Sequence, residues 1–344
     1  MIHVDLNLID GLTQSAREVL APVVVNASPG LFGLNDWACP SLPMHLAQWQ
    51  SDPSGVAWRR FAATEQAQFL ALGCSEFHPT TQFTSSEQRT HLNYAEPKSV
   101  RACGWVQPCW GLAAKIHMSA CEFGLPYRAE GANHGALPAS SPAVLSTDEG
   151  HVGYSTLRNR FSGPDLRALV DCGITPLFED PGTLNGAVFF MPSVYLSEQT
   201  ARRRLFLETL CASRFIHHLI ALIITGPEIG SADGVVDLAG HYLAKYVLDD
   251  QFASEEMKAR YPLRESSVNL IGKGDGQTGQ LSVTLMFNRL ALAAPPHSSD
   301  SWDTRAFSHC LFTFSVEKYA DEELRAVVEN CDVSSVSNSA GGDD

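Results

Sequence analysis

The residues of this chain that are best suited to chemistry are cysteines and histidines. Cys109 can be paired with His117 or with His134, and a thiol next to an imidazole is the nucleophile of cysteine hydrolases. No signature around Cys109 supports such a pair, and it is one of nine cysteines in the chain. We therefore predict no catalytic residue and keep a thiol-dependent hydrolase using Cys109 as the alternative from the enzyme class.

Two adjacent histidines, His217 and His218, are the next candidates. Neighbouring residues on an α-helix point about 100° apart, so the pair does not easily bind one metal ion. His241 is a conceivable third ligand, but nothing near it in the sequence fixes it in place. We predict ordinary hydrogen-bonded histidines and no metal site.

A glycine-rich segment, Gly274 to Gly279, matches the pattern G-x-G-x-x-G. A phosphate-binding version of this pattern must open a helix, because the amides at a helix N-terminus hold the anion. Here the residues that follow, Leu281 to Phe287, alternate like a strand, and an apolar run from Val268 to Ile271 comes before. Two such runs around a Gly/Asp-rich turn predict a β-hairpin, and we predict no cofactor.

The composition excludes several classes of protein. With 44% hydrophobic and 18% charged residues among 344, the chain can bury a large core, and its 26 Gly and 19 Pro suit a loop-rich fold. A net charge of −14 argues against nucleic acid or an anionic membrane surface as a partner. The cysteines form no C-x-x-C pair, which favours reduced thiols in the cytoplasm. No secretory signal is recognisable, and the closest approach to a membrane span, Leu219 to Thr225, is too short.

The composition and the hydrophobic periodicity predict an α/β (α+β) fold. The strongest helix covers Ser197 to Thr225, and Ser231 can cap a second amphipathic helix. The segment Gly104 to Phe123 has helical periodicity, and Pro108 must lie in the first turn of this helix or break it. The other expected helices cover 5–20, Val56–Glu65, 163–173 and Asp321–Glu329. The expected strands are Pro22–Asn26, Phe69–Cys74, Pro126–Glu130, Ile174–Phe178, Ala187–Met191 and Phe307–Phe314. Loops or disordered segments are expected at 31–50, 76–98, 131–146 and 333–344.

Several segments, taken in order, resemble the large subunit of the type VI secretion contractile sheath, the TssC (EvpB/VipB) family. The likeness is carried by Cys211-Ala-Ser-Arg-Phe-Ile-His-His-Leu, Ile229-Gly-Ser231 and Lys258-Ala-Arg-Tyr-Pro-Leu-Arg-Glu265. Earlier segments fit as well, namely Pro22 to Gly33, Val56 to Phe61 and Gly173 to Leu177. The matching family-motif residues are Ser213, Arg214, Phe215, His217, Pro262, Leu263, Arg264 and Glu265.

The resemblance implies a structural role and no enzymatic activity. Sheath subunits complete one another's sheets with extended strands, so the C-terminal hairpin would pair with another chain. The residues expected in this inter-subunit pairing are Val268, Leu270, Ile271, Leu281, Val283, Leu285 and Phe287. The implied partners are further copies, a small sheath subunit (TssB-like), an inner tube protein (Hcp-like) and the baseplate.

The resemblance also implies contractile-sheath-like mixed sheets flanked by helices, and a domain organisation. We expect a middle sheath-like α/β domain over residues 1–200 and an inner sheath-like domain with long helices and the hairpin over 201–292. Residues 293–344 would form a C-terminal extension. The region that family members carry before the first strand is short here, so a sheath-like cap, baseplate adaptor or regulator is an alternative within the same class.

Overall fold

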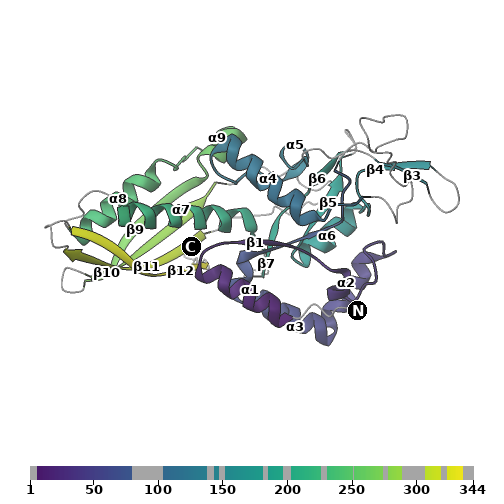
Figure 1. The fold of residues 1–344 in the computed structure, drawn as a ribbon, viewed down its shortest axis with the longest axis horizontal. Helices are drawn as coiled ribbons and strands as arrows, with labels where there is room; N and C mark the ends of the chain where they lie inside the picture. The colour runs from purple at the N-terminus through teal and green to yellow at the C-terminus, as the bar shows by residue number, and fades with distance from the viewer. Residues whose placement is uncertain are drawn as a thin grey trace, which may run out of the picture.

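The computed structural model describes residues 6–79, 104–137, 143–146, 152–180, 185–196, 203–225, 231–250, 252–273, 278–288, 307–318 and 324–335 (Figure 1). The helices are α1 Leu6–Glu18, α2 Leu42–Ser51, α3 Pro53–Ala62, α4 Pro108–Phe123, α5 Gly131–His134, α6 Gly163–Asp171, α7 Phe206–Thr225, α8 Ala232–Ala244 and α9 Glu255–Arg260, with 3-10 turns at Pro29–Phe32 and Glu65–Phe69. The strands are β1 Val23–Asn26, β2 Leu70–Cys74, β3 Ala143–Ser146, β4 Val152–Ser155, β5 Ile174–Glu179, β6 Gly186–Val188, β7 Pro192–Leu196, β8 Arg203–Leu205, β9 Leu263–Lys273, β10 Thr278–Phe287, β11 Phe307–Lys318 and β12 Leu324–Ser335. The predicted α/β class with mixed sheets is confirmed.

The first sheet has the strand order β1-β2-β5-β6, in which the first three strands run parallel and β6 runs antiparallel. All five residues of β2 are buried, as expected for an internal parallel strand with both faces covered. Its side chains alternate between two cores: Leu70 and Leu72 face the side of α2 and α3, and Ala71 faces the side of α4. In Figure 1, α4 accordingly lies on one side of this sheet and α2 and α3 lie on the other.

An aromatic cluster fills the core beneath α2 and α3. The ring of Phe32 lies 4.9 Å from that of Trp49 and 5.7 Å from those of Trp37 and Trp58, measured between centroids. Residues 31–50 were expected to be loop-rich, with Pro40 and Pro43 blocking long regular structure, but α2 begins at Leu42. Pro43 does not block this helix, since a proline in the first turn costs no backbone hydrogen bond.

Helix α4 packs closely on β2. It begins at Pro108, so this proline lies in the first turn and does not break the helix. A Cβ atom added to Gly73 of β2 would lie only 2.9 Å from a methyl carbon of Leu112 in α4. Glycine at this position therefore sets how near the helix comes to the sheet. The strand predicted at Pro126–Glu130 was wrong, because these residues form a turn and an extended segment after α4.

The second sheet has the order β12-β11-β10-β9 and is antiparallel throughout. β9 and β10 form the predicted C-terminal hairpin, and the strand that follows the glycine-rich segment rules out a phosphate-binding helix start. The turn itself, 274–277, lies outside the described residues. Helices α7 and α8 pack against one face of the sheet and share a core with the side chains of β10 (Figure 1).

The helix predicted at Asp321–Glu329 was wrong. Residues 324–329 of this segment belong to β12, which pairs with β11 from Leu324 to Ser335. Its charged residues have good helix propensity, but that preference is weak compared with the backbone hydrogen bonds of a long ladder. The segment predicted to be disordered from Val333 onward includes the last residues of β12.

Helix α7 is long and apolar enough to cross a membrane by length and composition, and 56% of that stretch is buried inside the protein. Its buried side chains contact both the first and the second sheet, Phe206 and Leu207 in one core and Phe215 and Leu219 in another. Such burial is typical of the central helix of a water-soluble fold. The helix starts later than predicted, because Arg203–Leu205 forms β8 and pairs with β7.

A buried carboxyl group, that of Glu130, lies where the first sheet meets the segment after α4. Its Oε2 accepts a hydrogen bond of 2.7 Å from the backbone N–H of Met191, and the residue is 6% exposed. Burial raises the pKa of Glu130 to about 7 from 4.5, although the hydrogen bond from Met191 acts in the opposite direction. The folded protein therefore holds this proton more tightly than the unfolded chain does.

We predict that the free energy of unfolding decreases as the pH rises from about 4.5 to about 7, because of the raised pKa of Glu130. The folded state binds more protons than the unfolded state in this window, so the free energy of unfolding falls by about 3 kcal/mol in total. Urea unfolding of Glu130→Gln, which keeps an acceptor for Met191, should show this dependence removed and a more stable protein near pH 8. The exposed Glu18→Gln should leave the pH profile unchanged, and equal profiles for wild type and Glu130→Gln would contradict the assignment.

Candidate functional site

The family-motif residues on α7 hold the helix in place. Phe215 is buried, with its ring 5.0 Å from that of Tyr246, and the Ser213 hydroxyl donates to the carbonyl of Thr209 at 2.8 Å. His217 lies 3.0 Å through Nε2 from the backbone oxygen of Val19, which ties α7 to the end of α1. The contacts of Phe215 and His217 join α7 to neighbouring segments, whereas the hydrogen bond of Ser213 lies within α7 itself.

The two adjacent histidines diverge as predicted. While His217 contacts the end of α1, the ring of His218 stacks on Tyr242 of α8 at 4.7 Å between centroids. His241 lies one residue before that tyrosine on α8. Within the described residues, no group of three His, Cys, Asp or Glu side chains is arranged to hold a metal ion.

The segment Pro262 to Glu265 starts β9. The N–H of Leu263 donates to the carbonyl of Tyr246, and its own carbonyl accepts from the N–H of Leu248 at 2.7 Å, which makes a short parallel bridge. Leu263 is fully buried in the core beneath the second sheet. Arg264 is exposed and lies 3.6 Å from a carboxylate oxygen of Asp249, and Glu265 is exposed as well. The motif thus sets the angle at which the chain enters the sheet.

Asn288, which directly follows β10, joins three segments at this entry. Its buried side-chain amide lies 3.0 Å from the carbonyl oxygens of Leu248 and Tyr261 and 3.1 Å from that of Leu263. Because the amide has only two N–H groups, one of them is shared. Its backbone N–H donates to Pro262 at 2.6 Å, and its carbonyl accepts from the hydroxyl of Tyr127. The sequence analysis missed this residue, since its partners are distant in the chain.

The residues predicted for inter-subunit pairing fall into two groups. Four side chains of β10 are buried in the core, and β10 is hydrogen-bonded on both edges, to β9 and to β11. On β9, Val268 and Leu270 are half-buried and Ile271 is 45% exposed. β9 is an edge strand of the described sheet, so its outer edge from Arg264 onward can accept another strand. The four β10 residues are Leu281, Val283, Leu285 and Phe287.

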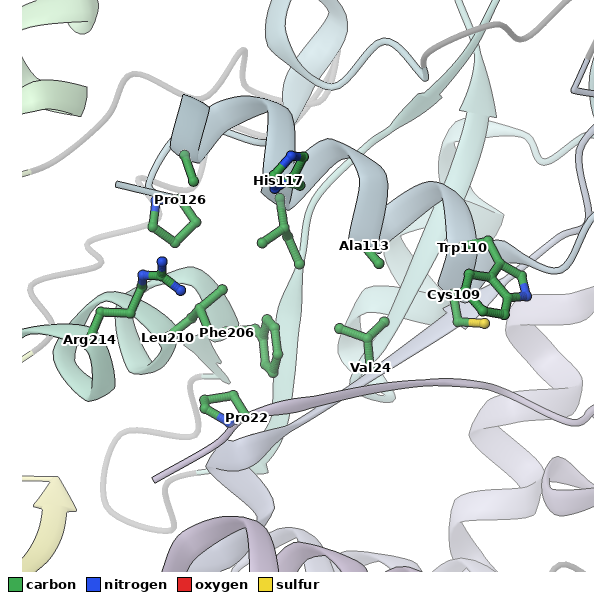
Figure 2. A pocket seen from close by; sticks show the side chains of 12 residues that line it. Pro22, Val24, Cys109, Trp110, Ala113, His117, Pro126, Phe206, Leu210 and Arg214 are labelled. Carbon is green, nitrogen blue, oxygen red and sulfur yellow. The ribbon is translucent and has the colours of Figure 1, made fainter. Parts of the chain in front are cut away.

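The Cys109–histidine pair does not form. The backbone N–H of Cys109 donates to Asn26 at 2.9 Å, whereas Nε2 of His117 lies 3.5 Å from the sulfur of Cys121. His134 contacts the ring of Phe123 instead. Cys109 and His117 stand apart along α4 in Figure 2. Of the two histidines considered, neither His117 nor His134 contacts the thiol of Cys109 among the contacts of the described residues.

An apolar groove of about 560 Å³ lies between α4, the start of α7 and β1. Figure 2 shows Pro22 and Phe206 on one side of it, Ala113 of α4 on the other, and Arg214 at one end. Trp110, at the opposite end, is 70% exposed. Arg214 is therefore the family-motif residue of α7 that reaches this surface, and the sequence analysis did not foresee the groove.

Most of the chain is similar in sequence to a known protein family. Residues 2–195 match the family model described as EvpB/VC_A0108, tail sheath N-terminal domain, and residues 179–290 match the EvpB/VC_A0108 tail sheath gpW/gp25-like domain. The chain belongs to the EvpB/VC_A0108 tail sheath family. The resemblance seen in the sequence motifs is confirmed, and the motif residues of α7 and of the β9 entry lie within the second matched region.

A curated relative in this family is similar along most of the chain. The type VI secretion system sheath protein TssC1 of Pseudomonas aeruginosa is 22% identical over an alignment of 303 positions, which covers 80% of this chain. The chain spans 58% of the length of that relative. The second sheet extends past the matched regions, because β11 and β12 lie after residue 290.

We predict that Asn288→Ala destabilises the fold by about 3 kcal/mol, because buried carbonyls lose their donors. Urea unfolding should show the loss, and Asn269→Ala, an exposed asparagine on β9, should change the free energy of unfolding little. Equal stability of the two variants would show that the Asn288 amide does not hold the junction.

Proposed function

We propose that this protein is a structural subunit of a type VI secretion contractile sheath, assembled by β-strand pairing between subunits. The observation that carries the proposal is that the two tail sheath family matches together span residues 2–290. The similarity to TssC1 supports it independently. As in the sequence analysis, we assign residues 1–200 to a middle domain and 201–292 to an inner domain.

The outer edge of β9 supports this mode of assembly. An edge strand presents unpaired N–H and C=O groups that pair readily with a strand of another chain. β9 is long, from Leu263 to Lys273, and its exposed residues include the apolar Ile271. Such an edge is a liability in a monomer, so a partner strand is expected to cover it. We therefore place Val268, Leu270 and Ile271 beside the incoming strand.

The partners that we propose follow from the family. They are further copies of the chain, a TssB-like small sheath subunit, an Hcp-like inner tube and the baseplate. The net charge of −14 disfavours nucleic acid and anionic membranes as partners, and reduced cysteines fit a cytoplasmic assembly. A sheath subunit of this kind needs no cofactor and no catalytic group.

A second candidate within the class is a cap, baseplate adaptor or regulator of the sheath. The observation that favours it is the pairing of β10 with β11 of the same chain, which leaves β10 no free edge for a strand of another subunit. Subunits that extend a sheath and subunits that end it would differ in how many free edges they offer. Electron microscopy of the chain co-expressed with a small sheath subunit separates the two: long tubes support a bulk sheath role, and discrete rings or small complexes support a cap.

We predict that Ile271→Lys prevents assembly and leaves the monomer folded. A lysine on an edge strand opposes pairing with another strand, and an exposed substitution costs the monomer about 0.5 kcal/mol or less. Sedimentation of the chain co-expressed with a small sheath subunit measures the loss of large assemblies. Met44→Lys on α2 is the matched control, because it adds the same charge at an apolar side chain that is 70% exposed.

The two variants separate the hypotheses about this edge. If Ile271→Lys and Met44→Lys assemble equally well, β9 is not the pairing edge. If wild-type protein remains monomeric with and without the small subunit, the structural role itself is contradicted.

A further inference from the structure

Helix α1 carries an apolar stripe on the face that it turns away from its own core. The stripe consists of Leu8, Leu12 and Val19, which directly follows the helix, and all three side chains are exposed. At 100° per residue they lie within about 40° of one another around the helix axis. Among the described residues, no other helix exposes three large apolar side chains. Single exposed apolar residues are common, but a row of this kind indicates a surface that another element covers.

The groove between α4 and the start of α7 matches this stripe in length. Along α4 it extends from Trp110 to Ala120, which is about 15 Å, and the stripe from Leu8 to Val19 spans about 16 Å. The lining is mostly apolar, and a volume of about 560 Å³ suits the side chains of one helix face. A helix that lays its apolar face into a groove is a recurring mode of protein recognition.

The charges at one end of the two surfaces are complementary. Arg214 stands at one end of the groove (Figure 2), is exposed, and has no carboxylate partner among the described residues. Glu18, the last residue of α1, borders the stripe beside Val19 and is exposed. Arg17 lies 3.0 Å from a carboxylate oxygen of Glu65, so its charge is already compensated. The C-terminal carbonyls of a helix carry a partial negative charge, which adds to the attraction for a guanidinium group.

The stripe and the groove cannot meet within one molecule. The inner face of α1 packs on the side of the first sheet that holds α2 and α3, where Ile9 shares a core with Leu70 and Leu72. The groove lies on the other side of this sheet, where Val24 of β1 packs against the core beneath α4. Because the stripe points away from the core that Ile9 enters, the sheet separates it from the groove of its own chain. A second copy can bring the two surfaces together.

We propose that α1 of one molecule docks into the α4–α7 groove of a second copy of this chain, with Leu8 beside Trp110 and Glu18 beside Arg214. The inference rests on the proposed function only in requiring that copies associate. The contact is made by side chains of a helix, so it is independent of strand pairing at β9. It joins two unlike surfaces, and a contact of that kind continues from copy to copy until it closes into a ring or extends into a filament.

Charge reversal in the full-length chain tests the orientation. Glu18→Arg and Arg214→Glu should each weaken self-association about tenfold, because each variant places like charges at every contact between its own copies. An equimolar mixture of the two variants should recover association, since contacts between unlike chains again pair opposite charges. Sedimentation velocity without a small sheath subunit measures both effects. Asp237→Arg, at an exposed carboxylate of α8, is the control and should associate like wild type.

Leu8→Asp tests the apolar part of the contact. It places a carboxylate against an apolar lining and should weaken self-association about tenfold or more. An acidic residue in the first turn of a helix does not oppose folding, so circular dichroism should show an unchanged monomer. Met44→Asp on α2 is the matched control, because the side chain of Met44 is 70% exposed and that of Leu8 72%.

The outcomes separate this inference from the proposed function. Unchanged self-association of Leu8→Asp, no recovery in the mixture, or wild type that does not self-associate overturns the docking of α1. The sheath role stands in each of these cases if the chain still assembles with a small sheath subunit. If only Arg214→Glu impairs that co-assembly, the small subunit occupies the groove, and the second-copy proposal is overturned as well. A chain that assembles neither alone nor with the small subunit overturns both.

Discussion

The fold depends on covering α7, a 20-residue helix with little polar surface. From Phe206 to Thr209 every residue is buried, and buried positions recur as far as Ile223. An apolar helix of this kind must be enclosed on most of its circumference, and one sheet cannot do that. The first sheet covers its start and the second sheet covers the rest, so α7 couples the two. Each large apolar side chain that it buries contributes about 1.5–3 kcal/mol.

Two buried polar side chains near this joint are bonded to backbone groups. The side-chain amide of Asn288 donates to the backbone carbonyls of Leu248 and Tyr261, which lie outside the strands of the sheet. The carboxyl group of Glu130 accepts from the backbone N–H of Met191. Tyr127 links them in space, because its ring stacks on Phe287 and its hydroxyl donates to Asn288. An unpaired polar group in such a place costs about 1–3 kcal/mol, so these bonds fix the joint in one arrangement. The bonds of Asn288 to Tyr261 and Leu263 lie at the Pro262–Glu265 motif, where the chain enters the second sheet.

Features with local causes could be predicted from the sequence. The alternation of Leu281, Val283 and Leu285 gave the hairpin, and Ser231 was correctly assigned as the cap of α8, since its hydroxyl accepts from Gly234. Features with distant causes could not. β12 depends on β11 for its ladder, the groove depends on how α4 and α7 meet at β1, and Asn288 has partners up to 161 residues away. The contact of His117 with Cys121, by contrast, has a local cause, since the two residues lie one helical turn apart on α4.

The order of the second sheet changes what a strand partner can meet. A β9–β10 hairpin alone would have two free edges, one along β9 and one along β10. The edge of β10, with its apolar residues, would associate more readily with another strand. With β11 in place, β10 is interior, and the edges of the described sheet are β9 and β12. Strand pairing is directional, so a subunit with one family-derived edge and one edge from outside the family domain presents two unlike surfaces. Unlike edges favour head-to-tail contacts, which either close into a ring or continue into a filament according to the rotation between neighbours.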